Sequence, residues 1–209
     1  DLILLKSKKI KFYPSSDIVK EFISKPEPVR TPSWLKDMPL YIPPATSLEV
    51  EVIPNWTAKR CVPFIDSFNT GYTFNLWCDV QVRIIEGQQR ITWNFFKSEH
   101  DELNPIADRP DANLPIWDGF QPFTCSWISQ WGIKTPKGYS CLFTHPLNRT
   151  DLPFITSTGI MDTDKWGIWG NQPFALRTDF EGIIPAGTPI IQFIPFKREN
   201  WLSEIDESL

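Results

Sequence analysis

Closely spaced metal ligands and long apolar runs are both missing from this sequence. The four cysteines occur singly, with no Cys-x-x-Cys pair, and the histidines are only His100 and His145. Because a zinc site needs soft ligands at close spacing, the sequence argues against one. No apolar run approaches the roughly 20 residues that span a bilayer, so we expect no membrane partner.

Basic charge is also scarce. The formal net charge is -4, and the main basic cluster lies at Lys6, Lys8, Lys9 and Lys11. We interpret this cluster as a solvated strand or arm, because nucleic-acid-binding domains are more basic than this chain. No nucleic-acid partner is therefore expected. The stretch from Asp1 to Leu5 is apolar, but it lacks a basic lead and is too short for a signal peptide.

The cysteines each lie beside apolar or aromatic residues, as in Trp77-Cys78 and Cys141-Leu142-Phe143. Free thiols behave as small core hydrophobes, so we expect buried free cysteines and a reducing compartment.

Proline and tryptophan are abundant, at 20 and 10 residues. Prolines at this frequency interrupt helices and end short strands. Tryptophans bury large areas and also anchor interfaces. Since a chain of this size can bury only some of them, we expect others to contact a second chain in a homo-oligomer.

Strand patterns dominate from residue 48 onward. Alternation at 48–52, 80–84 and 90–95 predicts strands, and the turn at Glu86-Gly87 predicts a hairpin between the last two. Further strands are expected at 73–80, 123–134, 139–144, 172–178 and 188–196, with a long loop at 97–122 and no convincing helix after residue 40. These short strands indicate a mainly β fold, a barrel or a jelly-roll-like domain.

The first 55 residues are expected to form an extended N-terminal arm, and residues 56–209 a β-barrel domain. Residues 9–13 alternate as a half-buried strand does. Ser15-Ser16-Asp17 predicts the cap of a short helix that runs to Ile23. Thr31-Pro32 predicts the start of a second short helix.

Several segments resemble motifs of the dUTPase and dCTP-deaminase β fold. They are residues 66–80, 135–150, 159–164 and 181–192, and the resemblance spans about residues 64–198. It implies a dUTPase-like topology, a trimer, and a set of ligand-binding candidates: Tyr72, Thr73, Arg149, Asp162, Asp164 and Gln192.

The resemblance is incomplete at the positions that carry chemistry. Thr73 replaces a motif aspartate, Pro189 replaces an arginine, and Arg149 lacks the Ser-Gly that would follow it. The C-terminal glycine-rich phosphate clamp has no counterpart. A triphosphate needs several cations, amides or a metal to offset its charge, so these losses favour a non-enzymatic relative.

Asp162 takes the position of the family's water-activating aspartate and is the candidate catalytic residue. Asp162 and Asp164 could hold Mg²⁺ if the chain binds nucleotides, because hard oxygen ligands suit that ion; otherwise no cofactor is expected. The alternative is that both aspartates organise a turn. Gly71, Gly138, Gly159 and Gly187 are expected to supply positive φ in tight turns.

A second resemblance covers nearly the whole chain. Residues 12–15, 135–154 and 182–201 are similar to an uncharacterised protein family of tailed phages of marine bacteria. This implies a phage source, other phage proteins as partners, and a location in the host cytoplasm or the virion.

Three functions remain open from the sequence. The first is a structural or interaction protein without turnover. The second is a nucleotide-binding or nucleotide-hydrolysing enzyme of the dUTPase type. The third is glycan binding, in which sugars stack on Trp117, Trp127 and Trp131. A nucleophile pair of Cys141 and His145 is disfavoured, because an extended strand holds these positions too far apart.

Overall fold

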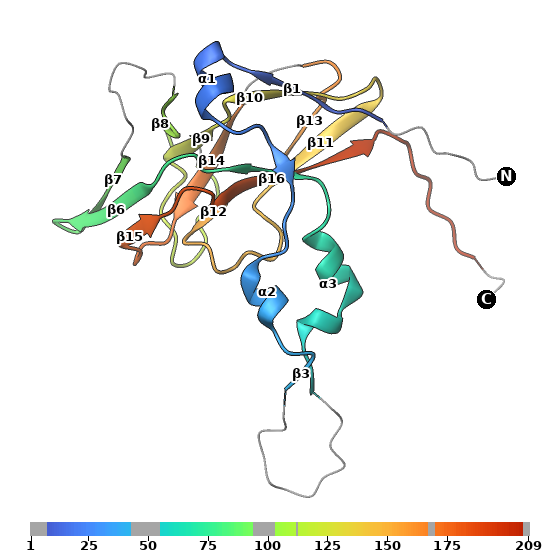
Figure 1. Ribbon diagram of the computed structural model, residues 1–209, viewed down its shortest axis with the longest axis horizontal. Helices are drawn as coiled ribbons and strands as arrows, with labels where there is room; N and C mark the ends of the chain where they lie inside the picture. Colours follow the sequence, from blue (N-terminus) through green and yellow to red (C-terminus); the bar gives the residue numbers. More distant parts are fainter. Residues whose placement is uncertain (1–7, 43–54, 94–102, 112, 167–169, 207–209) are drawn as a thin grey trace, which may run out of the picture.

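The fold is built almost entirely from short antiparallel strands (Figure 1). The structure is a computed structural model that describes residues 8–42, 55–93, 103–111, 113–166 and 170–206. The largest sheet has five strands, in the order β13 (Gly159–Met161), β11 (Tyr139–Thr144), β16 (Pro189–Lys197), β5 (Tyr72–Asn75) and β2 (Glu27–Pro28).

The other described strands form four smaller sheets. A four-stranded sheet has the order β12 (Phe154–Thr156), β14 (Asn171–Leu176), β9 (Cys125–Ile128) and β8 (Ile106–Asp108). A three-stranded sheet joins β15 (Gly182–Ile184), β6 (Val80–Ile85) and β7 (Gln88–Trp93). Two strand pairs complete the set: β1 (Lys11–Pro14) with β10 (Trp131–Lys134), and β3 (Tyr41–Ile42) with β4 (Asn55–Trp56). The predicted mainly β class is confirmed, and the described strands form separate sheets, not a closed barrel.

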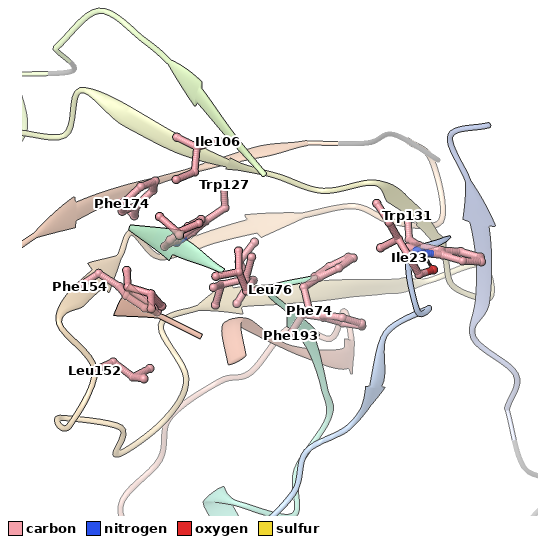
Figure 2. Close-up of a cluster of buried hydrophobic side chains, with 14 of the residues drawn as sticks. Ile23, Phe74, Leu76, Ile106, Trp127, Trp131, Leu152, Phe154, Phe174 and Phe193 are labelled. Carbon is pink, nitrogen blue, oxygen red and sulfur yellow. Dashed lines mark hydrogen bonds between the residues drawn. The ribbon is translucent and has the colours of Figure 1, made fainter. Parts of the chain in front are cut away.

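The two largest sheets share one hydrophobic core (Figure 2). Phe193 and Phe74 enter it from the five-stranded sheet, and Trp127 and Phe174 from the four-stranded sheet. Trp127 is fully buried and stacks on Phe174, with ring centroids 3.7 Å apart. Burial of aromatic rings of this size supplies much of the hydrophobic stabilisation of a small domain.

A buried threonine ties the two sheets together through hydrogen bonds. The Trp127 indole Nε1 donates to Thr156 Oγ1 at 3.1 Å, and Thr156 Oγ1 donates to the Ile190 carbonyl at 2.7 Å. The indole N–H and the threonine hydroxyl, both placed in the core, are thereby satisfied, as buried polar groups must be.

Helices are few and short among the described residues: α1 (Asp17–Phe22), α2 (Ser33–Asp37), the 3₁₀ turn η1 (Ala58–Arg60) and α3 (Val62–Ser67). Ser16 caps α1, since its side chain accepts a hydrogen bond from Val19 N at 3.2 Å. The predicted helices at 17–23 and after Thr31 are confirmed. After residue 40, where no convincing helix was expected, the described residues hold only η1 and α3. α3 has six residues, too few to show a helical period, and Pro63 lies in its first turn, where proline is tolerated.

The strand predictions are largely confirmed. β1, β6, β7, β11, β14 and β16 overlap the segments predicted as strands, and the hairpin turns at Glu86 and Gly87, both with positive φ. The expected loop at 97–122 contains β8, which pairs with β9. The strand predicted at 48–52 lies outside the described residues.

The N-terminal segment packs into the body of the molecule. β1 pairs with β10, β2 pairs with β5, and Val19 and Ile23 are buried in the core. The Trp131 indole donates to the Ile23 carbonyl at 3.1 Å. Figure 1 shows α2 and α3 on one side of the sheets, with β3 beyond them. A domain boundary at residues 55/56 stays a prediction.

All four cysteines are free, as expected. Burial, with a contribution from Asp79, raises the pKa of the Cys78 thiol to about 11, and burial also raises the pKa of Cys141. Burial was expected for all four and holds for Cys78 and Cys141. Cys125 is only half-buried, and Cys61, at the N-terminus of α3, is exposed. None of the described helices is long and apolar enough to cross a bilayer.

Candidate functional site

The face of the five-stranded sheet that carries Thr73 and Gln192 is one wall of a pocket. Thr73 on β5 is paired with Gln192 on β16 in the antiparallel ladder. Because side chains alternate along a strand, Thr73, Asn75 and Gln192 lie on one face, while Phe74 and Phe193 lie on the core side.

Gln192 holds together two segments that are far apart in the sequence. Its side chain is 1% exposed, and Nε2 donates to the carbonyls of Ser67 at 3.1 Å and Thr70 at 2.8 Å. Its Oε1 accepts from the Leu147 amide at 2.8 Å. All the hydrogen-bonding capacity of the amide nitrogen is used inside the protein. Gln192 is therefore a structural bridge between the loop before β5 and the loop after β11.

Gly71 lies beside this bridge, in a conformation that strongly favours glycine. Its φ is +77°, and an added Cβ would lie 2.2 Å from the Phe193 carbonyl oxygen. The positive φ expected at this turn is confirmed, as it is at Gly138 and Gly187. Gly159 is an exception, because it lies in strand β13 without positive φ.

The pocket lies between this sheet face and the N-terminal segment 22–32, and its volume is about 540 Å³. That size is within the usual range for small-ligand sites. Thr73, Arg149 and Gln192 all line it, so the structure brings these three candidates together. The Arg149 guanidinium is held by Asp151, with Nε donating to Oδ1 at 2.7 Å and Nη2 to Oδ2 at 2.8 Å.

Asp162 and Asp164 lie elsewhere, in an ion-pair network around Arg198. Arg198 Nη1 donates to Asp164 Oδ1 at 2.8 Å, Nη2 contacts Asp164 Oδ2, and Nη1 lies 3.0 Å from Asp162 Oδ1. Asp162 also accepts from Ser140 Oγ at 2.7 Å and from Lys165 Nζ at 2.8 Å. The Gly138 amide donates to Asp164 Oδ2 at 2.7 Å.

This network neutralises both carboxylates. Hydrogen bonds from Lys165 and Ser140 hold the pKa of Asp162 below its ordinary value. Arg198 holds the pKa of Asp164 well below its usual range, and the Asp164 side chain is only 4% exposed. Two carboxylates in this state are fully ionised and already matched by cations, which leaves them poorly suited to take up a water proton.

The network and the pocket lie at opposite ends of the β11–β16 ladder. Tyr139 pairs with Lys197 beside the network, and Thr144 pairs with Gln192 beside the pocket. Five residues of strand separate the two ends, about 17 Å. Within one chain, therefore, Asp162 and Gln192 do not share a site.

The described residues contain no group of three or more His, Cys, Asp or Glu side chains arranged to hold an ion. Asp164 instead fastens the turn before β11 through Gly138, and the Asp162 carbonyl accepts from the Lys165 and Trp166 amides. Asp164 thus makes the side-chain-to-backbone bond that the turn-organising alternative predicts. Among the described residues, the Asp162 side chain bonds instead to the side chains of Ser140, Lys165 and Arg198.

The remaining candidates are separate from the pocket. Tyr72 stacks on Phe193 with ring centroids 5.6 Å apart, on the opposite face of β5 from Thr73. Cys141 accepts a hydrogen bond from Thr163 Oγ1, whereas His145 contacts Arg149 O and Thr156 N. These two side chains form no nucleophile pair.

The tryptophans proposed for glycan stacking are not a common surface. Trp117 is 56% exposed, but Trp127 is fully buried and Trp131 is 9% exposed. The expectation that all three rings are exposed is wrong, because strands β9 and β10 turn the last two into the core, a placement that alternation in so apolar a stretch could not reveal.

Sequence reasoning missed several residues of the ion-pair network and of the pocket. Arg198, which follows directly after β16, carried no motif, and its role depends on β16 pairing with β11. Lys25, Arg30 and Asn75 line the pocket and were also missed. Strand alternation on β5 would have placed Asn75 beside Thr73, but no local signal places the N-terminal segment against that face.

Comparisons with known proteins are sparse. No family model matches the chain, and no curated protein matches it. Solved structures similar to the chain include a dUTPase from phage phi11 of S. aureus, with 13% identity over 62% of this chain and 97% of that one, at a TM-score of 0.30.

Further matches are also phage dUTPases. A mutant of the phi11 enzyme matches with 14% identity over 62% of this chain and 97% of that one, at a TM-score of 0.30. A mutant dUTPase of Staphylococcus bacteriophage 80alpha with dUpNHpp matches with 15% identity over 62% and 89%, at 0.29. Superpositions this loose establish neither a shared fold nor a shared activity.

Proposed function

We propose that the chain is a non-enzymatic interaction protein built on an antiparallel β scaffold. The observation that carries this proposal is the hydrogen bonding of Asp162 and Asp164, the carboxylates on which a hydrolytic role would depend. Both are occupied by Arg198, Lys165 and Ser140 within the same chain. A general base needs a free lone pair within reach of a water molecule, and these oxygens already accept strong charge-assisted hydrogen bonds.

The hydrogen bonds of the Gln192 side chain support the same conclusion. Its amide nitrogen donates to two backbone carbonyls and its oxygen accepts from a third backbone group. A ligand that recruited this side chain would have to break contacts that hold two loops in place, at a cost typical of exposing buried unpaired groups.

Exposed aromatic side chains support the interaction role. Among the described tryptophans, Trp56, Trp117, Trp166 and Trp201 are each more than half exposed. Trp56 lies opposite Tyr41 on the β3–β4 strand pair with the rings in edge contact, and the Arg60 guanidinium carbon lies 3.2 Å from the Trp56 ring centroid. Tryptophan, tyrosine and arginine are the residues enriched at interface hot spots.

We place the protein in the host cytoplasm or in the virion, as the second sequence resemblance implies, and propose that it acts as a homo-oligomer and through other phage proteins. A trimer is the state that the dUTPase resemblance implies. Light scattering coupled to gel filtration would give the native mass. A monomer at micromolar concentration would reject self-association.

The decisive experiment is a hydrolysis assay of the purified chain. We expect no release of phosphate or pyrophosphate from dUTP, dCTP or ATP with Mg²⁺, for the native chain and for Asp162→Asn alike. Turnover that Asp162→Asn abolishes would reject the proposal and favour the nucleotide-hydrolysing alternative. Glycan binding has lost two of its three stacking rings and is the weaker alternative.

A further inference from the structure

The pocket between β5 and the N-terminal segment contains a polar group that the protein itself leaves unused. Thr73 is 5% exposed, and its hydroxyl finds no hydrogen-bond partner in the described part of the chain. No fully enclosed side-chain nitrogen or oxygen of the described residues lacks a partner. The Thr73 hydroxyl must therefore be open to the pocket that it lines.

A second polar side chain points the same way. Asn75 lies two residues along β5, on the same face as Thr73, and it is partly buried at the pocket wall. Its amide likewise makes no hydrogen bond within the described ranges. Thr73 and Asn75 together present donors and acceptors about 7 Å apart along one strand. Buried polar groups are normally satisfied, so this pair indicates a polar ligand or water at that wall.

Basic side chains outnumber acidic ones in the described lining of the pocket. Three cationic side chains of the described lining, Lys25, Arg30 and Arg149, face a single acidic one, Glu27. Glu27 is matched by Arg30, with Arg30 Nη2 2.7 Å from Glu27 Oε2, and Arg149 is matched by Asp151. Lys25 has no ion-pair partner among the residues that the structure describes, so it is the cation left to meet an anion.

Apolar groups complete the enclosure. Trp77, Pro28 and Pro189 line the pocket beside the polar pair. The Trp77 indole N–H donates to the Leu103 carbonyl at 3.1 Å, which fixes the ring. A concave site with an apolar wall, a few convergent polar groups and a cationic mouth is the usual form of a site for a small organic anion.

We propose that this pocket binds a small organic anion. Its phosphate or carboxylate group pairs with Lys25, its polar atoms bond to Thr73 and Asn75, and its body packs on Pro28 and Trp77. The N-terminal segment supplies the cation and closes one side of the site. Binding here requires no turnover and goes beyond the proposed interaction role.

The test uses phenyl phosphate and benzoate as the two anionic probes, with benzyl alcohol as the uncharged control. Amide chemical shifts of the nitrogen-15-labelled full chain are followed during titration. We expect one or both anions to bind with a Kd on the order of 1 mM at low salt, because small exposed sites bind weakly. The largest shifts should lie in residues 24–31 and 73–75.

Two variants test the assigned contacts. Thr73→Val keeps the side-chain shape but removes the unused hydroxyl, and we expect the Kd to rise about fivefold, as for loss of one hydrogen bond. Lys25→Gln should raise the Kd by a similar factor of about five. Lys20→Gln, an exposed lysine on α1 that does not line the pocket, is the matched control and should leave the Kd unchanged.

The melting temperature separates binding from folding. Because the Thr73 hydroxyl makes no internal hydrogen bond, Thr73→Val should melt at the native temperature or above it. The proposal is overturned if neither anion shifts any residue, if benzyl alcohol binds as well as the anions do, or if both variants bind with the native Kd. None of these outcomes bears on the hydrolysis assay, so the two proposals fail independently.

Discussion

Arg198 and Asp164, 34 residues apart, form the most enclosed ion pair of the described chain: Nη1 donates to Oδ1 at 2.8 Å, and the carboxylate is 4% exposed. The pair joins the end of β16 to the turn after β13, and Arg198 Nη1 also donates to the Tyr139 carbonyl at 3.0 Å. One guanidinium therefore fastens three segments at this end of the sheet.

Replacing Arg198 should destabilise the fold. Arg198→Met leaves the enclosed Asp164 carboxylate without its main partner, and an uncompensated enclosed charge is costly. The matched control is Arg177→Met, which breaks the Arg177–Asp179 pair, whose side chains are 51% and 67% exposed. We expect the urea midpoint to fall clearly for Arg198→Met and hardly at all for the control; equal midpoints would contradict the structural role.

The same pair makes a prediction for acid stability. The folded-state pKa of Asp164 lies below its ordinary value of 3.8, so its contribution is complete above that pH and is lost as the pH falls below it. Thermal melts of the native chain should therefore show a falling limb below about pH 4. Arg198→Met should reduce this fall of the melting temperature with pH. An unchanged fall would show that Asp164 does not cause it.

Protonation of His145 should produce a second loss of stability on acidification, in a pH range above that of Asp164. Thr156 N donates to its Nδ1 at 3.3 Å and its Nε2 lies 3.0 Å from Arg149 O, so the neutral ring is satisfied. Burial lowers its pKa below 6.5. The unfolded chain then binds the proton more readily, and stability falls as the pH drops from 6.5 toward the lower folded pKa. Melting curves between pH 8 and pH 5 should show this limb, and His145→Gln should weaken it.

Gln192→Ala should cost about 2–4 kcal/mol of unfolding free energy. The substitution leaves the Ser67 and Thr70 carbonyls and the Leu147 amide without their partner. Gln88→Ala on β7 is the control, because that side chain is exposed, and it should stay within about 0.5 kcal/mol of the native value. Chemical denaturation measures both. If Gln192→Ala loses no more unfolding free energy than the control, water replaces the hydrogen bonds of Gln192 without cost.

A pair of glycine variants separates backbone strain from steric overlap. Gly71→Ala meets a positive φ and a carbonyl oxygen 2.2 Å from the new Cβ, whereas Gly87→Ala meets a positive φ with nothing within 4 Å. We expect a loss of at least about 3 kcal/mol for Gly71→Ala and about 1 kcal/mol for Gly87→Ala. Similar losses in urea denaturation would show that the loop before β5 moves to accommodate the methyl group.

Local patterns predicted most of the secondary structure because their physical causes are local. Ser16 caps α1 through a bond to a residue three positions away, and the β6–β7 hairpin follows from alternation around a turn. Alternation within β5 was equally visible. It could not say which face of β5 meets the core, so Tyr72 and Thr73 were both proposed as ligand-binding residues although they face opposite sides.

The sequence by itself determined that this is a mainly β protein with free cysteines and short capped helices at its start, because composition, alternation and capping act within a few residues. Only the tertiary structure decided which side chains meet. The placement of β16 between β11 and β5 puts Gln192 against Thr73 at one end and Arg198 against Asp164 at the other. Pairings between strands far apart in the sequence, such as β5 with β16, depend on the packing of the whole core, and no local pattern encodes them.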